Sequence, residues 1–262
     1  MHAEDPPFVE EAWFTAGSNP AGAMRLFLFP FAGGNANAFL SWQALLGPRL
    51  ELRVAQLPGR GVRLFDPPVA DLDELVARLS RAVTELADRP FLFFGHSLGA
   101  LVAFEVARQL RRTGRPEPVA LWVSGAEGPR TRLLRQQVHD LEEAELIEAL
   151  REYSGTASEM LDDRELMRLV LPGVRADFAL SERYVYRGEP PLDLPISVLL
   201  GDSDPYVDPE RAAGWAQESS LPVRQRTYPG AHFFLNDHQQ AIATLLASSA
   251  GELPTDRCGK PL

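Results

Sequence analysis

The feature that most constrains the fold is a series of short apolar runs separated by segments of helical length. The runs are continuous and rich in Val, Leu and Phe, and they cover residues 25–29, 50–57, 91–95, 119–124, 195–201 and 223–228. Such runs are typical of strands buried on both faces of a sheet. The segments at 72–87, 98–112, 209–218 and 237–249 have helical length. Strands that alternate with helices predict an α/β fold, with a mostly parallel sheet between two helical layers.

One long insertion interrupts this alternation between residues 124 and 195. It spans about 70 residues, which is too long for a loop without secondary structure in a compact domain. Its segments LEEAELIEALREY and DRELMRLVLPGVRADFALSERYVY carry apolar residues at helical spacing. We therefore predict a helical lid at about 128–190 within one domain, 25–250, flanked by an N-terminal segment, 1–24, and a flexible tail, 251–262.

Composition excludes several classes of function. The net charge of −10 argues against a broad surface for nucleic acid or anionic membranes. The N-terminus lacks the pattern of a secretory signal, and no stretch approaches the ~18 apolar residues of a membrane span, so we expect a cytoplasmic protein. Cys258 is the only cysteine, which leaves no internal disulfide and no thiolate zinc site.

The segment GHSLG, residues 95–99, joins an apolar strand directly to an apolar helix. The pattern G-x-S-x-G in this setting is typical of a nucleophile elbow, in which a strained turn exposes the serine hydroxyl. Side chains in place of Gly95 or Gly99 would crowd the strand against the helix. Ser97 is therefore the candidate nucleophile, and the alternative is an ordinary serine cap at the helix N-terminus.

A serine hydroxyl needs a base, and His232 is the best placed of the five histidines. It follows the last predicted strand, and in a doubly wound sheet the active site lies beyond the carboxyl ends of the strands, where Ser97 also lies. His238, in the predicted last helix, is the alternative base. His96 is next to the serine in sequence but is expected to point away from it.

A serine and a histidine base usually act with a carboxylate as the third member of a catalytic triad. GDSDPYVDPE offers three aspartates after the strand at 195–201. The order Ser, Asp, His along the chain is that of the hydrolase elbow enzymes. We favour Asp204 over Asp202 because Pro205 holds it in an extended conformation. Asp208, ahead of Pro209, is expected to cap a helix.

The negative oxygen of a tetrahedral intermediate needs two donors. One is the backbone N–H of Leu98, at the start of the helix. The other should come from LFLFPFAGGNANAF, where Gly33 and Gly34 let the backbone approach a substrate. A phosphate-binding loop is the competing interpretation of this segment, but its pattern and its lysine are missing.

Taken together, these segments resemble the α/β-hydrolase thioesterases, and in particular the type II thioesterases that accompany polyketide synthases and nonribosomal peptide synthetases. The likeness runs from Trp13 to about Ala250. It rests on the segments LFLFPFAGGNANAF, QLPGRGVR, GHSLGALVAFEVARQL, LPGVRADFALSERYVYR, GDSDPYV and PGAHFFL. The resemblance implies an α/β-hydrolase fold whose lid shapes an acyl chamber and an entrance for a phosphopantetheine arm.

The resemblance also implies functional residues. Ser97, Asp204 and His232 match the family's triad, and Ala32, with Phe31 as the alternative, matches its second oxyanion donor. Phe31 stands where the family often has histidine, and Gly61 where it often has an acidic residue. Neither difference touches the triad.

The expected activity is hydrolysis of acyl thioesters on an acyl or peptidyl carrier protein, a transient partner. The substrate itself carries the phosphopantetheine, so we expect no cofactor and no metal, and we expect a monomer. An esterase or acyl-CoA hydrolase, and a catalytically silent binding protein, are the alternatives. Because carrier proteins are generally acidic, we expect docking on a basic rim. The candidate docking residues are Arg60, Arg63, Arg130, Arg132 and Arg135.

Overall fold

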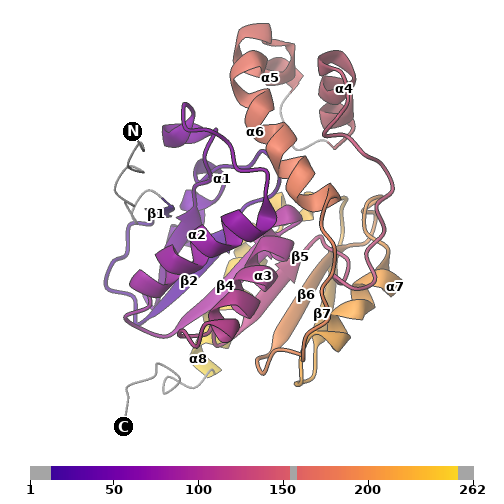
Figure 1. The fold of residues 1–262 in the computed structure, drawn as a ribbon. Coiled ribbons are helices and arrows are strands. Elements are labelled where there is room, and N and C mark those ends of the chain that lie inside the picture. Colours follow the sequence, from indigo (N-terminus) through magenta and orange to yellow (C-terminus); the bar gives the residue numbers. More distant parts are fainter. Residues whose placement is uncertain (1–12, 154–157, 253–262) are drawn as a thin grey trace, which may run out of the picture.

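A seven-stranded sheet forms the centre of the computed structural model, which describes residues 13–153 and 158–252 (Figure 1). The order across the sheet is β1-β3-β2-β4-β5-β6-β7. Only β1 pairs antiparallel, with β3, and every other neighbouring pair is parallel. The strands are β1 (Phe14–Ala16), β2 (Met24–Phe29), β3 (Leu50–Ala55), β4 (Phe91–His96), β5 (Leu121–Ser124), β6 (Ile196–Gly201) and β7 (Arg224–Tyr228). The predicted α/β fold is confirmed.

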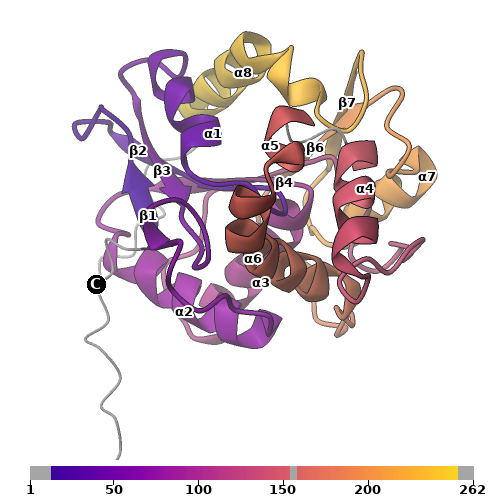
Figure 2. The ribbon, with the colours of Figure 1, turned by 90° about the horizontal axis from the view of Figure 1, so that it is seen from above.

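Helices cover both faces of this sheet (Figure 2). On one face lie α2 (Leu72–Glu85), α3 (Leu98–Arg112) and the short α7 (Pro209–Ala212), and on the other α1 (Asn37–Leu40) and α8 (Gln239–Glu252). The central strands β2 and β4 are fully buried and divide their side chains between the two layers. Phe27 and Phe93 pack toward α2 and α3, whereas Leu28 and Phe94 pack toward α1 and α8.

The sheet differs from the sequence prediction at both edges. β1 lies within the predicted N-terminal segment, and its three residues are too few to form a recognisable apolar run. β7 was predicted to be buried on both faces, which is wrong: Arg224, Gln225, Arg226 and Thr227 are exposed. An edge strand has a neighbour on one side only, so polar side chains are tolerated there.

Two helical segments differ from the prediction. The segment predicted as a helix at 209–218 forms only α7 and continues as a 3₁₀ helix, Ala213–Gln217. The last helix begins at Gln239, so His238 precedes it rather than lying within it. The tail beyond Glu252, including Cys258, lies outside the described residues.

The insertion forms a lid above the carboxyl ends of the strands (Figure 1). Its helices are α4 (Glu143–Tyr153), α5 (Ser158–Asp162) and α6 (Arg164–Glu182). They share a small core of their own, built from side chains such as Leu146, Leu161, Met167 and Leu171. Within the described residues, no helix is both long enough and apolar enough to cross a membrane.

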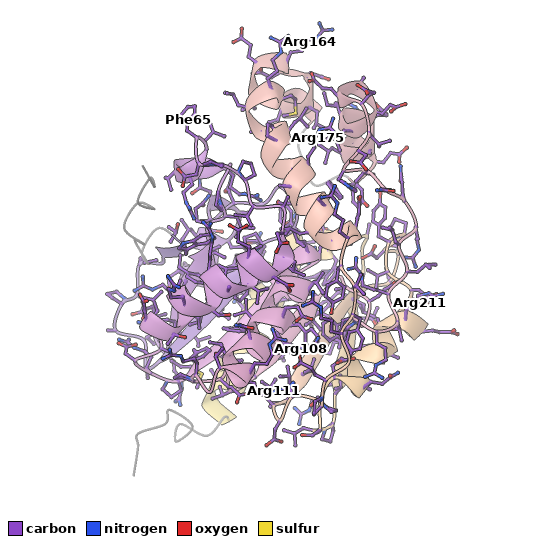
Figure 3. The ribbon with its side chains drawn as sticks, viewed as in Figure 1. Phe65, Arg108, Arg111, Arg164, Arg175 and Arg211 are labelled. Atoms are coloured by element: carbon purple, nitrogen blue, oxygen red, sulfur yellow. The ribbon has the colours of Figure 1, made fainter. Side chains whose placement is uncertain are left out.

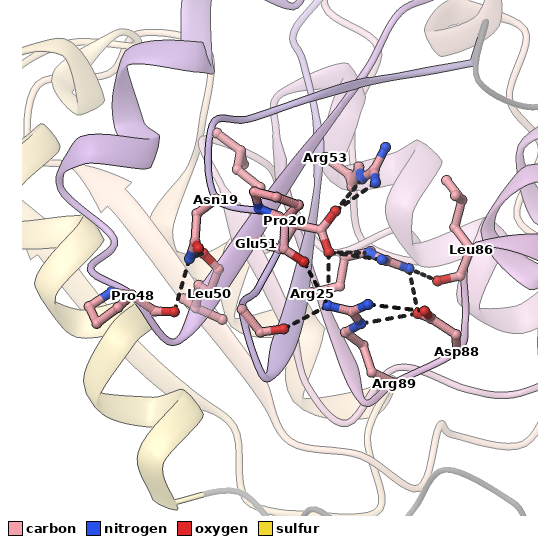
Figure 4. Close-up of polar contacts among 12 residues, drawn as sticks. Asn19, Pro20, Arg25, Pro48, Leu50, Glu51, Arg53, Leu86, Asp88 and Arg89 are labelled. Carbon is pink, nitrogen blue, oxygen red and sulfur yellow. Dashed lines mark hydrogen bonds and ion pairs between the residues drawn. The ribbon is translucent and has the colours of Figure 1, made fainter.

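A buried ion pair ties β2 to β3 at the amino ends of the strands (Figure 4). The Arg25 guanidinium contacts one carboxylate oxygen of Glu51 through Nε at 3.0 Å and Nη2 at 2.8 Å. Both side chains are almost fully buried. Arg53 and Arg89 approach the same carboxylate, so this edge of the sheet carries a compact charge network remote from the lid.

Candidate active site

Ser97 occupies the turn between β4 and α3 in a strained backbone conformation. Its φ of 55° and ψ of −118° make it the single non-glycine residue with positive φ in the part of the chain that the structure describes. A Cβ on Gly95 would lie 2.1 Å from the carbonyl oxygen of Gly99, and a Cβ on Gly99 would lie 1.9 Å from that of Phe29. Glycine at both positions therefore allows the tight turn that exposes the serine.

The hydroxyl of Ser97 contacts His232 instead of capping α3. Nε2 of His232 lies 2.9 Å from Ser97 Oγ, and Nδ1 lies 2.8 Å from Oδ2 of Asp204. The side chains of Asp204 and His232 are 1% and 6% exposed. Ser97 makes no side-chain hydrogen bond to the helix that it precedes, so the interpretation of Ser97 as a helix cap does not hold. The three side chains form one hydrogen-bonded chain from carboxylate to hydroxyl.

The three aspartates after β6 have separate structural roles. Asp204 orients His232 through Oδ2, and its Oδ1 accepts from the backbone N–H of Tyr206 at 2.9 Å. Asp202 instead accepts from the N–H of Gly230 at 3.0 Å. Asp208 caps α7, as predicted, by accepting from the N–H of Glu210. Of these carboxylates, the structure brings only that of Asp204 to the histidine.

The other described histidines lie outside this chain of hydrogen bonds. His238 contacts the carbonyl oxygen of Pro229 at 2.9 Å, and His139 contacts Glu182 at the end of the lid helix α6. His96 is buried and points to Ser124 Oγ, 2.9 Å away. Among the described residues, no group of three or more His, Cys, Asp or Glu side chains could hold a metal ion.

Both predicted oxyanion donors border the same pocket as Ser97. Leu98 is the first residue of α3, where backbone N–H groups have no partner within the helix. Ala32 lies in the loop after β2 and lines the pocket beside Ser97, while Phe31 lines a smaller adjoining cavity. This placement is compatible with donation by Leu98 and Ala32, and their role in catalysis stays a prediction.

A pocket of about 280 Å³ lies between the sheet and the lid. The lid contributes Tyr153 and Phe178, which face Ser97 and His232 across the cavity. The ring of Tyr153 stacks on that of Tyr206 at 4.2 Å between centroids. Burial raises the pKa of Tyr153 to about 12, so its hydroxyl stays neutral at physiological pH.

The proposed basic rim is only partly present. Arg60 is buried and forms an ion pair with Asp177, so its assignment as a docking residue is wrong. Arg63 is half-buried, bonded to Asp66 and stacked over Trp13. Beside Asp66, this loop exposes two large apolar side chains, Val62 at 91% and Phe65 at 89%. Figure 3 shows Phe65 projecting from the surface.

The other three arginines lie on or beside the strap, which we define as residues 129–136. Arg130 is exposed and contacts Tyr186, while Arg135 is exposed at the pocket mouth. Arg132 lines the pocket and donates two hydrogen bonds to Ser181, and burial lowers the pKa of its guanidinium. The strap therefore retains positive charge at the mouth, although each of these side chains also has an intramolecular partner.

Comparison with known proteins identifies the family. The model of the thioesterase domain family matches residues 24–249, which is most of the chain. The chain belongs to the thioesterase family. The family resemblance predicted from the sequence motifs is thereby confirmed, together with the general activity, thioester hydrolysis.

The thioesterase has relatives that match along most of their length. It is 37% identical to the gramicidin S biosynthesis protein GrsT of Aneurinibacillus migulanus, over 85% of this chain and 88% of that protein. It is 38% identical to the thioesterase PikA5 of Streptomyces venezuelae, over 85% of this chain and 79% of that protein. The structure of BorB, the type II thioesterase from the borrelidin biosynthetic cluster, matches with a TM-score of 0.84 and 34% identity, over 95% of this chain and 99% of BorB.

Sequence reasoning missed several residues around the pocket of the thioesterase. Tyr153 and Tyr206 were not singled out, because nothing in the sequence indicates that residues from the lid and from the loop after β6 stack. Asp177 was also missed, although it carries a detectable signal. It is an acidic residue within a run of buried positions, 176–180, on α6, and a charge at a core-facing position requires a partner.

His96 lies directly behind the base. Its ring centroid is 5.1 Å from that of His232, and its Nε2 is buried without a hydrogen-bond partner among the described residues. Burial, with a smaller contribution from a charged His232, holds the pKa of His96 well below 6.5. His96 therefore stays neutral while the unfolded chain takes up a proton near pH 6.5.

This difference predicts a pH dependence of stability. Below pH 6.5 the unfolded chain binds more protons than the folded one, so His96 should lower the free energy of unfolding as the pH falls, by up to about 1.4 kcal/mol per pH unit. His96→Gln, which can still contact Ser124, should flatten this slope. Urea unfolding at pH 7, 6 and 5 measures it, and parallel profiles for the two proteins would contradict the prediction.

Proposed function

We propose that this thioesterase hydrolyses acyl thioesters on the phosphopantetheine arm of carrier proteins, as an editing or release enzyme of polyketide or nonribosomal peptide biosynthesis. The observation that carries the proposal is the chain of hydrogen bonds from Asp204 through His232 to Ser97 at the floor of a lidded pocket. The similarity to a gramicidin S biosynthesis protein and to BorB supports the biosynthetic setting.

The first half-reaction transfers the acyl group to the enzyme. His232 Nε2 accepts the proton of Ser97 as Oγ attacks the carbonyl carbon of the thioester. The carbonyl oxygen becomes negative and accepts hydrogen bonds from the N–H groups of Leu98 and Ala32. When the tetrahedral intermediate collapses, the C–S bond breaks and the imidazolium returns the proton to the departing sulfur, which leaves as the thiol of the phosphopantetheine arm.

The second half-reaction releases the acid. A water molecule gives a proton to His232 Nε2 and attacks the acyl-enzyme carbonyl, and the same two N–H groups stabilise the negative oxygen. The C–O bond to Ser97 then breaks and Oγ regains the proton. Asp204 keeps Nδ1 of His232 protonated through both halves and stabilises the imidazolium without taking the proton itself.

The nucleophile assignment is tested by Ser97→Ala. We expect turnover of acyl thioesters to fall on the order of a millionfold, because the covalent route is lost. Ser220→Ala, which alters an exposed serine, is the matched control and should retain wild-type turnover. Steady-state hydrolysis with circular dichroism to confirm folding is the measurement. Turnover of Ser97→Ala within tenfold of wild type would refute the assignment.

The third position of the triad is tested by Asp204→Asn. The amide leaves the geometry nearly intact but favours the wrong tautomer of His232, so turnover should fall by about 10⁴. Asp202→Asn changes a neighbouring carboxylate that bonds Gly230, and its effect should be much milder. If the two variants ranked in the opposite order, the third position would belong to Asp202.

The carrier protein, a transient partner of a monomeric thioesterase in this proposal, docks at the strap. Strap residues line the mouth of the pocket, and among them Leu133 and Leu134 are 51% and 49% exposed. Arg135 adds positive charge at the same place. An acidic carrier would otherwise be repelled by the net charge of −10, so local attraction at the mouth would steer its approach.

Docking is tested with one acyl group presented on a carrier protein and on a small pantetheine thiol. We expect a higher kcat/KM for the carrier substrate, and an advantage that shrinks as salt screens the strap. Arg135→Gln should lower kcat/KM for the carrier about threefold to tenfold and leave the small thiol unchanged. Arg224→Gln, at the amino end of β7, is the control. If kcat/KM were equal for the two substrates and did not change with salt concentration, the alternative, a hydrolase of small substrates, would be favoured.

A further inference from the structure

An ion pair between the lid and the loop after β3 is buried beside the active site. Asp177, on α6, is 1% exposed, and the guanidinium of Arg60 meets its carboxylate with two contacts, one of them Nη2 to Oδ1 at 2.7 Å. Removing two charges from water is costly, and a buried pair seldom adds net stability. This cost raises the question of what else the pair does.

The carboxylate of Asp177 has a third partner in the loop after β2. Its Oδ2 accepts a hydrogen bond from the backbone N–H of Gly33 at 2.7 Å. The same loop has a second contact, because Arg60 Nη1 donates to the carbonyl oxygen of Gly34 at 3.3 Å. Gly33 directly follows Ala32, the residue whose N–H is proposed to stabilise the negative oxygen. Asp177 therefore fixes the peptide unit on one side of Ala32.

The peptide unit on the other side of Ala32 is fixed by a turn. The N–H of Gly34 donates to the carbonyl oxygen of Phe31 at 2.9 Å. A peptide bond is planar and trans, so the carbonyl of Phe31 and the N–H of Ala32 point in opposite directions. With the carbonyl held inside the turn, the N–H of Ala32 points outward, and Ala32 lines the pocket beside Ser97.

The lid helix is seated closely enough to make this contact. A Cβ on Gly173 of α6 would lie 2.8 Å from the carbonyl oxygen of Gly59, so the helix backbone rests directly on the loop that carries Arg60. Gln56 supports that loop by donating to the carbonyl oxygen of Arg60 at 2.9 Å while accepting from the N–H of Ala36 at 3.1 Å. Helix α6, the loop after β3 and the loop after β2 thus meet at the carboxylate of Asp177.

We propose that Asp177 and Arg60 are positioning residues that hold the N–H of Ala32 toward the carbonyl oxygen of the substrate, so that the lid helix α6 is part of the oxyanion site. The inference rests on the proposed function, in which Ser97 attacks an acyl carbonyl. It gives Arg60 a role inside the molecule in place of the docking role expected from the sequence.

The proposal predicts a selective kinetic defect. A misplaced donor weakens binding of the negative oxygen, which is absent from the bound substrate and develops in the transition state and tetrahedral intermediate, so kcat falls while KM changes little. Asp177→Asn keeps the side-chain shape but sets an amide donor or a neutral oxygen against the guanidinium. We expect kcat to fall about 10- to 100-fold, less than for complete loss of a donor, with KM within about threefold. Arg60→Lys, which keeps the charge but loses the two-point contact, should show a smaller loss of the same kind.

The experiment uses p-nitrophenyl acetate, whose hydrolysis in the proposed mechanism uses Ser97 and the oxyanion donors but no carrier protein. A second readout is the affinity for a boronic acid that forms a tetrahedral adduct with serine, and it should weaken by the same factor as kcat. Glu51→Gln is the matched control, because it removes a carboxylate from another buried arginine pair, at the opposite end of the strands. It should lower the thermal midpoint without changing kcat or boronic acid affinity.

Each outcome separates the possibilities. If Asp177→Asn and Arg60→Lys lose thermal stability but retain kcat and boronic acid affinity, as Glu51→Gln should, the pair is only structural and the proposal is overturned. If Asp177→Asn does not fold, Arg60→Lys alone decides by the same criteria. If the wild type cleaves the ester through Ser97 but no acyl thioester, the proposed function fails, and the variant kinetics still decide the positioning role.

Discussion

The contact between Gly99 and the backbone of β2 sets the geometry on which the site depends. Because a Cβ on Gly99 would lie 1.9 Å from the carbonyl oxygen of Phe29, helix α3 can start directly against β2 only if this residue is glycine. This close approach leaves Ser97 at positive φ above the sheet. It also brings the loop that begins after Phe29, and contains Ala32, next to the serine. Nucleophile and proposed oxyanion donors are therefore placed by one packing constraint.

The lid is joined to this site at several separate points. Tyr153 stacks on Tyr206, whose backbone N–H in turn bonds Asp204. Asp177 bonds the loop that contains Ala32, and Arg132 joins the strap to Ser181 of α6. The lid therefore contacts the loop that carries Asp204, the loop that carries Ala32 and the strap at the pocket mouth. A displacement of the lid helices away from the sheet would break these contacts.

The sequence predicted most of the site because its residues occupy fixed positions relative to the strands. Ser97, Asp204 and His232 each follow a strand, and the carboxyl ends of parallel strands meet at one edge. Their order along the chain and the turn residues around them were therefore sufficient to select these three residues as candidates. The edges of the fold were harder. β1 was missed because it is only three residues long, and β7 was located but its burial was wrongly predicted, because its side chains are mostly polar and exposed.

The assignment of Arg60 failed for a related reason. Its partner, Asp177, is 117 residues away, and no local pattern reports which charges meet after folding. Surface exposure is the usual expectation for an arginine in a loop with glycine and proline. The one clue was the acidic residue among the buried positions of α6, because a buried carboxylate needs a cation or hydrogen-bond donors as partners. The structure supplies both, the cation from Arg60 and the backbone donor from Gly33, whose loop borders the pocket through Ala32. A residue that breaks the apolar pattern of a lid helix is thus where sequence reasoning should look for a link between the lid and the chemistry beneath it.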